Sequence, residues 1–347
     1  MNSELSSQQV QDIGEQGLLE RLQHFCSPEI IGDDAAVLET ASEQSLVVTT
    51  DVLVDGVHFS NVTTSPEDAG WRAAAANLSD LAAMGASPLG ITVGLGLPGE
   101  VRVSWVERLY QGMTECLQKY NTSIVGGDIV RSPVTTLAIT AFGQVHPSQI
   151  IRRSAAVVGD AIVVTGVHGA SHAGLQLLLH PELRQNLKDA ERTALIRAHQ
   201  RPQPRLDVLP ILWKILDSPS KIQNPKSKIP VAGMDSSDGL ADAIIQICRA
   251  SGVGALIEHR QIPLPKVFDH WLPQEQALEY ALYGGEDFEL VLCLPQELAS
   301  AFVQHLGEGA AIVGSITSGS TVLLHDEQKK FPDRVLNFSQ GFQHFGQ

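Results

Sequence analysis

Segments of strand and helix character do not alternate regularly along the chain, and their order constrains the fold more than any other feature. The apolar run Ser45–Asp51 predicts a buried strand, the Ala-rich stretch Pro66–Met84 predicts a long helix, and Leu89–Leu97 predicts a second strand. After the amphipathic helical stretch Trp105–Tyr120, two strand-like runs follow each other, a short one ending at Gly126-Gly127 (122–125) and a longer one (135–145). This order excludes a simple βαβ alternation and predicts a mixed α/β chain of the α+β class.

The chain is long enough for two domains. Its 347 residues exceed one average domain, and 43% apolar with 18% charged residues can supply two packed cores. We expect an N-terminal domain over residues 1–148 and a C-terminal domain over residues 149–347. Further predicted strands are Asp160–Thr165, Ile229–Met234, Phe288–Leu294, Ala311–Ile316 and Thr321–Leu324, and further predicted helices are Ser7–Cys26, Ala170–Leu179, Glu191–Gln200, Leu206–Leu216 and Gly239–Ser251. Asp217–Lys228, rich in Ser, Pro and Lys, predicts an exposed loop to which we assign no role.

The charge balance and the cysteines argue against several classes of protein. A net charge of −15 without a basic stripe is the opposite of what a nucleic-acid-binding protein needs. No apolar run approaches the roughly 20 residues that span a bilayer, so we expect no membrane partner. The four cysteines lie far apart and form no CxxC pair, which favours a reducing cytoplasm over a disulfide framework or a zinc site.

Acidic residues gather in six short motifs, several of them at strand ends or in Gly-rich turns. The motifs are Gly32-Asp33-Asp34-Ala35, Thr49-Thr50-Asp51, Asn77-Leu78-Ser79-Asp80, Gly126-Gly127-Asp128, Asp235-Ser236-Ser237-Asp238-Gly239 and Gly284-Gly285-Glu286-Asp287. Each has an ordinary structural alternative, because an Asp before a helix, such as Asp238, is commonly an N-cap and Gly-Gly-Asp is commonly a turn. One such motif alone therefore decides nothing about function.

Asp80 is harder to explain by an ordinary structural role. It lies in the apolar stretch Ala73–Ala83, where a buried carboxylate costs several kcal/mol unless it is paired or metal-bound. The nearest cation on the helix, Arg72, is about two turns away. We therefore expect a metal ion or a partner from elsewhere in the fold at Asp80, and Asp51 raises the same question at the end of its strand.

The residue types in these motifs indicate hard-cation chemistry. Carboxylates with Thr and Ser hydroxyls suit Mg²⁺ or Ca²⁺ rather than zinc. The chain has no GxxxxGK[ST] phosphate loop and no lysine before Lys119. Any bound phosphate would therefore need metal ions to neutralise its charge, helped by backbone N–H groups and arginines such as Arg153. His58 follows Asp51 closely in the chain and is a candidate for substrate contact.

Taken together, the six motifs in this order and spacing resemble those of the thiamine-monophosphate kinase family. The resemblance runs from about residue 12 to the C-terminus and includes His58-Phe59 and Leu81–Ala86 beside the motifs themselves. The family belongs to the superfamily of aminoimidazole-ribonucleotide synthetase, selenophosphate synthetase and the hydrogenase-maturation carbamoyl dehydratase. The resemblance implies the two-domain fold of that superfamily: an N-terminal α/β domain whose strands form a barrel-like dimer interface, and a C-terminal α+β domain.

The resemblance also implies roles at the positions that match the family's motifs. The implied ligands of several Mg²⁺ ions are Asp34, Thr49, Thr50, Asp51, Asp80, Asp128, Asp235 and Asp238. The implied ATP contacts are Gly127, Asp128, Arg153 and Ser237. The implied contacts to thiamine monophosphate are His58, Glu286 and Phe342, the last at a position where the family often has Tyr or Trp. A homodimer is implied by the resemblance alone.

The implied activity is a phosphotransfer from ATP to thiamine monophosphate, which yields thiamine diphosphate. In-line transfer of the γ-phosphoryl group needs positioning and charge neutralisation, and the acceptor phosphate is already ionised near pH 7. We therefore assign the aspartates as metal ligands and assign no general base. Two alternatives remain: another ATP-dependent enzyme of the superfamily, although Cys26 and the Cys-free C-terminus fit the selenium and hydrogenase reactions poorly, or a non-catalytic nucleotide- or thiamine-binding protein.

Overall fold

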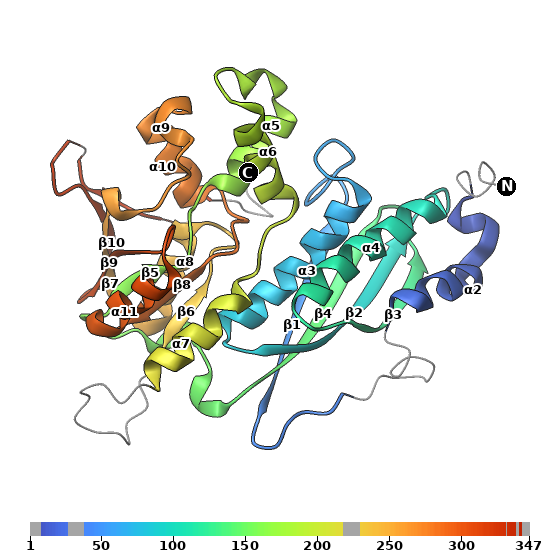
Figure 1. Ribbon diagram of the computed structural model, residues 1–347, viewed down its shortest axis with the longest axis horizontal. Coiled ribbons are helices and arrows are strands. Elements are labelled where there is room, and N and C mark those ends of the chain that lie inside the picture. Colours follow the sequence, from blue (N-terminus) through green and yellow to red (C-terminus); the bar gives the residue numbers. More distant parts are fainter. Residues whose placement is uncertain (1–7, 27–37, 218–229, 331, 338–339, 342–347) are drawn as a thin grey trace. The chain divides into compact units, whose positions relative to one another are not determined.

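The computed structural model describes residues 8–26, 38–217, 230–330, 332–337 and 340–341, which divide into two compact units (Figure 1). The first unit comprises Met1–Leu81 and Ala86–Val145, and the second comprises Ala82–Gly85 and His146–Gln347. Asp34 and Phe342, and all but the first residue of the predicted loop Asp217–Lys228, lie outside the described residues.

A four-stranded sheet in the order β1-β4-β2-β3 forms the first unit. Its strands are β1 (Ser45–Val54), β2 (Ser87–Leu97), β3 (Ile124–Arg131) and β4 (Thr136–Val145), and its helices are α2 (Val10–Leu22), α3 (Pro66–Ala83) and α4 (Val103–Lys119). β4 is antiparallel to both β1 and β2, whereas β2 and β3 are parallel. A parallel pair needs a crossover connection, and α4 supplies it.

One face of this sheet is covered and the other is open. Burial alternates from residue to residue along β4, and Leu81 of α3 lies against Gly143 on the covered face. On the open face, Leu46 and Val48 of β1 are 54% and 53% exposed. The prediction of a fully buried strand at Ser45–Asp51 is therefore wrong, because successive side chains of a strand point to opposite faces and only one face is packed here.

The Gly-Gly-Asp motif lies inside a strand and not at a turn. The predicted short strand 122–125 is in fact β3, in which Gly126, Gly127 and Asp128 pair with residues 92–94 of β2. A side chain at Gly127 would overlap the carbonyl oxygen of Val93, so the close pairing requires glycine there. Pairing with β2 outweighs the low strand propensity of glycine, which is why the sequence placed the strand end too early.

Helices α3 and α4 approach each other through two glycines. A Cβ atom on Gly70 would overlap the carbonyl oxygen of Leu109, and one on Gly112 would overlap that of Glu67. Only a residue without a side chain permits so close an approach of two helix backbones. The crossing therefore depends on one glycine from each helix.

A seven-stranded sheet in the order β11-β10-β7-β9-β5-β8-β6 forms the second unit. Its strands are β5 (Ala161–Val164), β6 (Ala232–Asp235), β7 (Gly254–Glu258), β8 (Leu290–Leu294), β9 (Ala311–Thr317), β10 (Val322–His325) and β11 (Arg334–Val335). Its helices are α5 (Ala170–Leu179), α6 (Asp189–Gln200), α7 (Leu209–Leu216), α8 (Leu240–Ser251), α9 (Phe268–Trp271), α10 (Gln274–Tyr283) and α11 (Gln296–Leu306).

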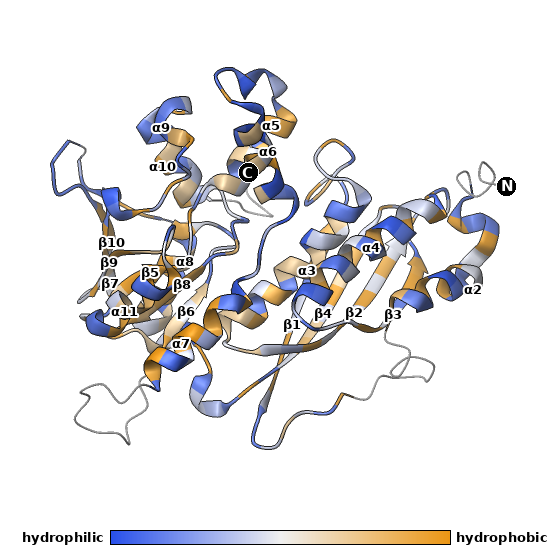
Figure 2. Ribbon diagram, in the orientation of Figure 1, coloured by the Kyte–Doolittle hydropathy of each residue, from blue (hydrophilic) through white to orange (hydrophobic). Residues whose placement is uncertain are grey.

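Helices pack on both faces of this second sheet. Ile162 and Val164 of β5 belong to a core that also holds residues of α8 and α10. Their neighbours Ala161 and Val163 belong to a second core with residues of α7 and α11, and Figure 2 shows α7 as strongly hydrophobic. A central strand that is buried on both faces contains only apolar residues, as β5 does.

Candidate functional site

In the first unit, β1 and α3 bring two predicted metal ligands together. Thr49 Oγ1 donates a short hydrogen bond to Asp80 Oδ2. Asp80 is only half-buried, which corrects the expectation of a fully buried carboxylate, and its expected partner from elsewhere in the fold is Thr49. Asp51 lies two residues beyond Thr49 and therefore on the same face of β1. The metal ion at Asp80 stays a prediction.

Two other predicted ligands, Thr50 and Asp128, lie on the open face of the same sheet. Thr50 Oγ1 is 2.9 Å from Thr140 Oγ1 across the β1–β4 pair. Asp128 pairs in register with Gly94, which in turn pairs with Ala138 on the face that carries Thr140. The strand alternation thus separates the side chains of Thr50 and Asp128 from those of Thr49 and Asp80.

His58 lies in a tight turn directly after β1. The Val54 N–H donates to His58 Nδ1 at 3.1 Å, and the His58 N–H donates to the Val54 carbonyl at 2.9 Å. Gly56 has a φ of 80°, a conformation that favours glycine, and it allows the chain to turn here. Because Nδ1 accepts a hydrogen bond, the neutral ring carries its proton on Nε2. The turn therefore fixes Nε2 as the donor of this imidazole.

In the second unit, β6 ends at Asp235 and the following turn leads into α8. Asp235 is buried, and Ser237 Oγ donates a 3.2 Å hydrogen bond to its Oδ1. Gly239, with a φ of 106°, is the N-cap residue of α8, so the alternative interpretation of Asp238 as that N-cap is wrong. The turn thus presents Asp235 and Ser237 as a joined pair of oxygen donors.

The structure joins the fifth and sixth motifs to each other. The Glu286 N–H donates to the Ser237 carbonyl at 2.7 Å, and the Ser236 N–H donates to the Glu289 carbonyl at 2.8 Å. Gly285 has a φ of 69°, and a side chain there would lie 2.7 Å from the Ser237 carbonyl oxygen. The acidic turn after β6 and the Gly-Gly-Glu-Asp turn before β8 therefore form one hydrogen-bonded unit.

Asp287 has a structural partner that the sequence did not reveal. Its carboxylate accepts hydrogen bonds from the N–H groups of Gly169 and Ser171, at 2.6 and 2.9 Å, at the start of α5. Burial raises the pKa of Asp287 to about 7, although these two donors lower it. Asp287 thus anchors the N-terminus of α5, where backbone N–H groups lack partners within the helix.

A buried histidine supports the acidic turn after β6. His168 Nδ1 lies 3.1 Å from the Gly166 carbonyl, and its Nε2 lies 3.1 Å from Ser236 Oγ. The carbonyl can only accept, so Nδ1 donates and Nε2 accepts from the serine hydroxyl. Burial lowers the pKa of His168 to about 4, which keeps the ring neutral. No spacing pattern in the sequence pointed to this residue.

Arg153, a predicted ATP contact, is held by side chains of α8. Its Nη1 donates to Gln246 Oε1 at 2.6 Å, and Gln246 Nε2 donates to Asp242 Oδ2 at 2.5 Å. Burial raises the pKa of Asp242, and Asp238 raises it further. Arg153, Asp238 and Asp242 are therefore close enough to interact electrostatically within the second unit.

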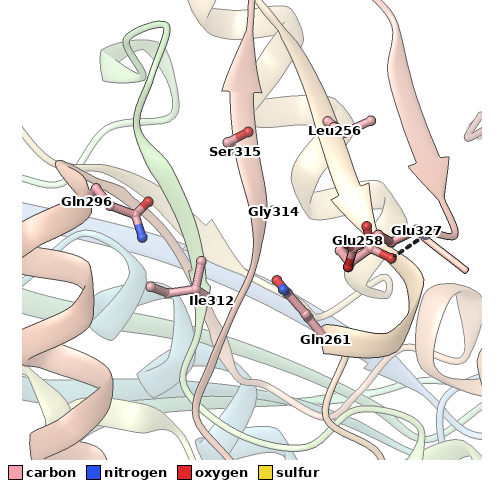
Figure 3. Close-up of a pocket in the computed structure, with 8 residues that line it drawn as sticks. All are labelled: Leu256, Glu258, Gln261, Gln296, Ile312, Gly314, Ser315 and Glu327. Atoms are coloured by element: carbon pink, nitrogen blue, oxygen red, sulfur yellow. Dashed lines mark hydrogen bonds between the residues drawn. The ribbon is translucent and has the colours of Figure 1, made fainter.

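The described residues hold no group of three His, Cys, Asp or Glu side chains close enough to form a complete metal cage. A hollow beside β7 and β9 is lined by Leu256, Glu258, Gly314 and Ser315, among others (Figure 3). None of its lining residues belongs to an acidic motif, so the hollow and the candidate site are distinct. All four cysteines are free thiols, and within the described ranges no helix has the length and apolar character needed to cross a membrane.

Comparison with known proteins adds the decisive observations. Two family models match this chain: AIR synthase related protein, N-terminal domain, over residues 32–145, and the corresponding C-terminal domain over residues 157–326. The thiamine-monophosphate kinase of Synechococcus elongatus is 50% identical over 343 residues, which are 98% of this chain and 99% of that protein. The chain belongs to the thiamine-monophosphate kinase family.

Solved structures agree with membership of the thiamine-monophosphate kinase family. The thiamine-monophosphate kinase from Stenotrophomonas maltophilia K279a is 32% identical with a TM-score of 0.76, and the match covers 89% of this chain and 96% of that chain. AaThiL complexed with AMPPCP and TMP is 31% identical with a TM-score of 0.70, and the match covers 94% of this chain and 97% of that chain. The predicted family and its two-domain α+β fold are thus confirmed, whereas the barrel-like assembly of the strands stays a prediction.

Proposed function

We propose that this chain transfers the γ-phosphoryl group of ATP to thiamine monophosphate and releases thiamine diphosphate and ADP. The observation that carries the proposal is the 50% identity to a thiamine-monophosphate kinase over 98% of the chain. The similarity to AaThiL complexed with AMPPCP, an ATP analogue, and TMP supports the same pair of substrates. The protein would act as a phosphotransferase with a phosphate group as acceptor.

Several Mg²⁺ ions belong to this proposal, and the oxygen donors of the described residues fit them. Mg²⁺ is usually held by one or two carboxylates, with waters and substrate phosphates completing its shell. The joined pairs Thr49–Asp80 and Asp235–Ser237 offer this kind of partial shell, and they contain no sulfur or imidazole ligand that would favour zinc. Bound Mg²⁺ would neutralise phosphate charge during transfer. Asp51 and Asp238 are proposed as further ligands, as are Asp34, Thr50 and Asp128.

The chain's own residues would bind and orient the two anions. Gly127, which is exposed on the edge strand β3, is proposed at the ATP phosphates, with Ser237 and Arg153 as further ATP contacts. Arg153 carries a fixed positive charge, and Gln246 holds its guanidinium from one side. His58 Nε2 and Glu286 are proposed as contacts to thiamine monophosphate, together with Phe342. The ionised acceptor phosphate needs no general base.

A homodimer is also proposed, through the open face of the first sheet. Leu46, Val48 and Val52 of β1 and Val130 of β3 are each about half exposed on that face. Leu46, Val48 and Val52 share that face of the edge strand β1, and Val130 lies on the opposite edge strand, β3. Exposed apolar side chains that gather on one sheet face are a common sign of an interaction surface. Figure 2 shows hydrophobic residues along these strands. A second copy of the chain, packed sheet against sheet, would cover them.

A coupled ADP-release assay tests the proposed reaction directly. The purified protein is mixed with Mg²⁺-ATP and thiamine monophosphate, free thiamine or no acceptor, and thiamine diphosphate is quantified by chromatography. We expect ADP and thiamine diphosphate in equal amounts with the monophosphate only. Turnover with free thiamine would overturn the acceptor assignment. ATP binding without turnover on any acceptor would favour the non-catalytic alternative, and removal of Mg²⁺ by EDTA should abolish turnover.

A further inference from the structure

The Gly-Gly-Glu-Asp turn of the second unit has a strained backbone. Glu286 and Phe288 have φ values of 59° and 54°, in the left-handed region that residues with a side chain rarely adopt. Each such residue is energetically unfavourable and persists only where its surroundings hold it. Strain of this kind gathers at functional sites, so the contacts that hold Glu286 are of interest.

A buried histidine on α6 contacts the Glu286 side chain. His199 Nδ1 lies 3.5 Å from Glu286 Oε2 and 3.3 Å from Ser171 Oγ at the start of α5. The His199 side chain is only 3% exposed, whereas that of Glu286 is 34% exposed. The histidine therefore approaches the carboxylate from the protein interior, and part of the carboxylate remains open to solvent or a ligand.

The chain that follows His199 makes a second contact near this turn, at Glu289, which lies three residues after Glu286. Arg205 Nη1 forms an ion pair with Glu289 Oε2 at 2.5 Å and donates to the Thr165 carbonyl at 2.7 Å. His199 thus contacts Glu286, and Arg205 contacts Glu289. The Arg205 contact is at the base of the turn next to β8, whereas the His199 contact is at the exposed carboxylate.

We propose that His199 is a positioning residue for Glu286 and that it orients the carboxylate which contacts thiamine monophosphate. The inference rests on the proposed function, because it takes Glu286 as a substrate contact. The buried imidazole contacts the Glu286 carboxylate through Nδ1 and restricts the rotamers of Glu286 in the free protein. Without this contact, Glu286 would lose that rotamer freedom only when it binds the ligand, at a cost in affinity. His199 itself need not touch the substrate, and Arg205 has no such role.

The position of the donor nitrogen gives the test. His199→Asn places an amide nitrogen near the position of Nδ1, His199→Gln places one near Nε2, and His199→Leu places none. Steady-state kinetics with each substrate are combined with calorimetric titration of thiamine monophosphate. We expect the KM and Kd for thiamine monophosphate to rise about tenfold for Leu and Gln, since immobilising a flexible side chain on binding costs about that much in affinity. The Asn variant should stay near the parent, and the KM for ATP should not change.

A double-mutant cycle and a control complete the experiment. In a Glu286→Ala background, His199→Leu should have no further effect on the affinity, because its influence passes through Glu286. His305→Leu, on α11, is the control and should behave as the parent. Equal effects of His199→Leu in both backgrounds, or no effect at all, would overturn the inference. If the parent binds thiamine monophosphate without turnover, the proposed kinase activity is overturned, and the Kd values of the variants still test the role of His199. A parent that neither binds nor converts thiamine monophosphate would overturn the proposed function and the role of His199 together.

Discussion

Asp80 differs from an ordinary helical aspartate because a strand residue, Thr49, holds its carboxylate. The short hydrogen bond from Thr49 orients one oxygen and leaves the carboxylate only half-buried. Accepting a hydrogen bond stabilises the charged form, which is the form that binds a cation. A carboxylate that is both oriented and partly accessible has the properties of a metal ligand.

Replacement of Asp80 tests that role at the level of one residue. We expect Asp80→Asn to lower kcat about a hundredfold or more, because the amide keeps the shape and the hydrogen bond but removes the charge that neutralises bound cations. Turnover is measured at saturating Mg²⁺, with thermal unfolding as the check on the fold. Asp189→Asn, in the first turn of α6, is the matched control. Normal turnover of Asp80→Asn with intact fold would exclude Asp80 as a metal ligand.

His168 makes stability depend on pH. Burial lowers its pKa from 6.5 to about 4, so between these values the unfolded chain binds a proton that the folded protein does not. The stability that depends on a neutral His168 is complete above pH 6.5 and is lost as the pH falls towards 4. The loss amounts to roughly 3 kcal/mol, at 1.36 kcal/mol for each pKa unit.

Substitution of His168 should flatten this dependence. Denaturant titrations of the parent and of His168→Asn between pH 7 and 4 give the free energy of unfolding of each. The difference in the free energy of unfolding between the two proteins should shrink as the pH falls. The parent loses stability because the unfolded chain binds a proton at His168, whereas the amide of the variant has no proton to gain. Parallel curves over this range would show that His168 is not the group responsible.

At the scale of elements, pairing and close packing decide what periodicity in the sequence leaves open. Helix α5 was predicted with its observed bounds, and α3 within one residue, because each combines a clear helical pattern with a clear end. Strand β7 and helices α10 and α11 carried no prediction. The extent of β3 depends on its partner β2, and no local pattern of Gly126 and Gly127 could indicate it.

The candidate site could be predicted as a set of residues but not as an arrangement. Sequence order alone identified the acidic motifs, and the structure joins Thr49 to Asp80 and the Asp235 turn to the Glu286 turn. The sequence could not show that Thr50 faces away from Thr49, or that Asp287 anchors a helix. His199 was missed because a lone histidine acquires its partner only through the fold. The roles of the site residues stay predictions.

The crossing of α3 and α4 offers a test at this scale. Gly112→Ala puts a methyl group onto the carbonyl oxygen of Glu67, which belongs to a helix backbone and cannot move aside cheaply. We expect a loss of about 2–3 kcal/mol in the free energy of unfolding, as for an overpacked core. Gly94→Ala is the control, because the nearest atoms to its new methyl group lie at 3.5 Å. Equal stability of both variants would show that the crossing adjusts freely.

At the scale of the whole molecule, the open face of the first sheet predicts self-association. Val48→Glu introduces a charge among the exposed apolar side chains of β1 on that face and should convert a dimer into a monomer, because an unpaired charge buried in an interface is costly. Light scattering after size exclusion gives the mass. Val158→Glu is the control, since Val158 is 55% exposed and Val48 53%. A parent that is already monomeric would contradict the proposed homodimer.

The alternation along β1 has an evolutionary consequence. The Thr49 side chain points to the helix-covered face of the sheet and that of Thr50 to the open face, so neighbouring residues of the strand lie on opposite faces. A single inserted or deleted residue upstream in the strand would exchange the two faces, moving a proposed cation ligand outward and apolar side chains inward. A change of two residues would restore the facing. The length of this strand can therefore drift only in even steps, whereas the loops on either side of it are under no such restriction.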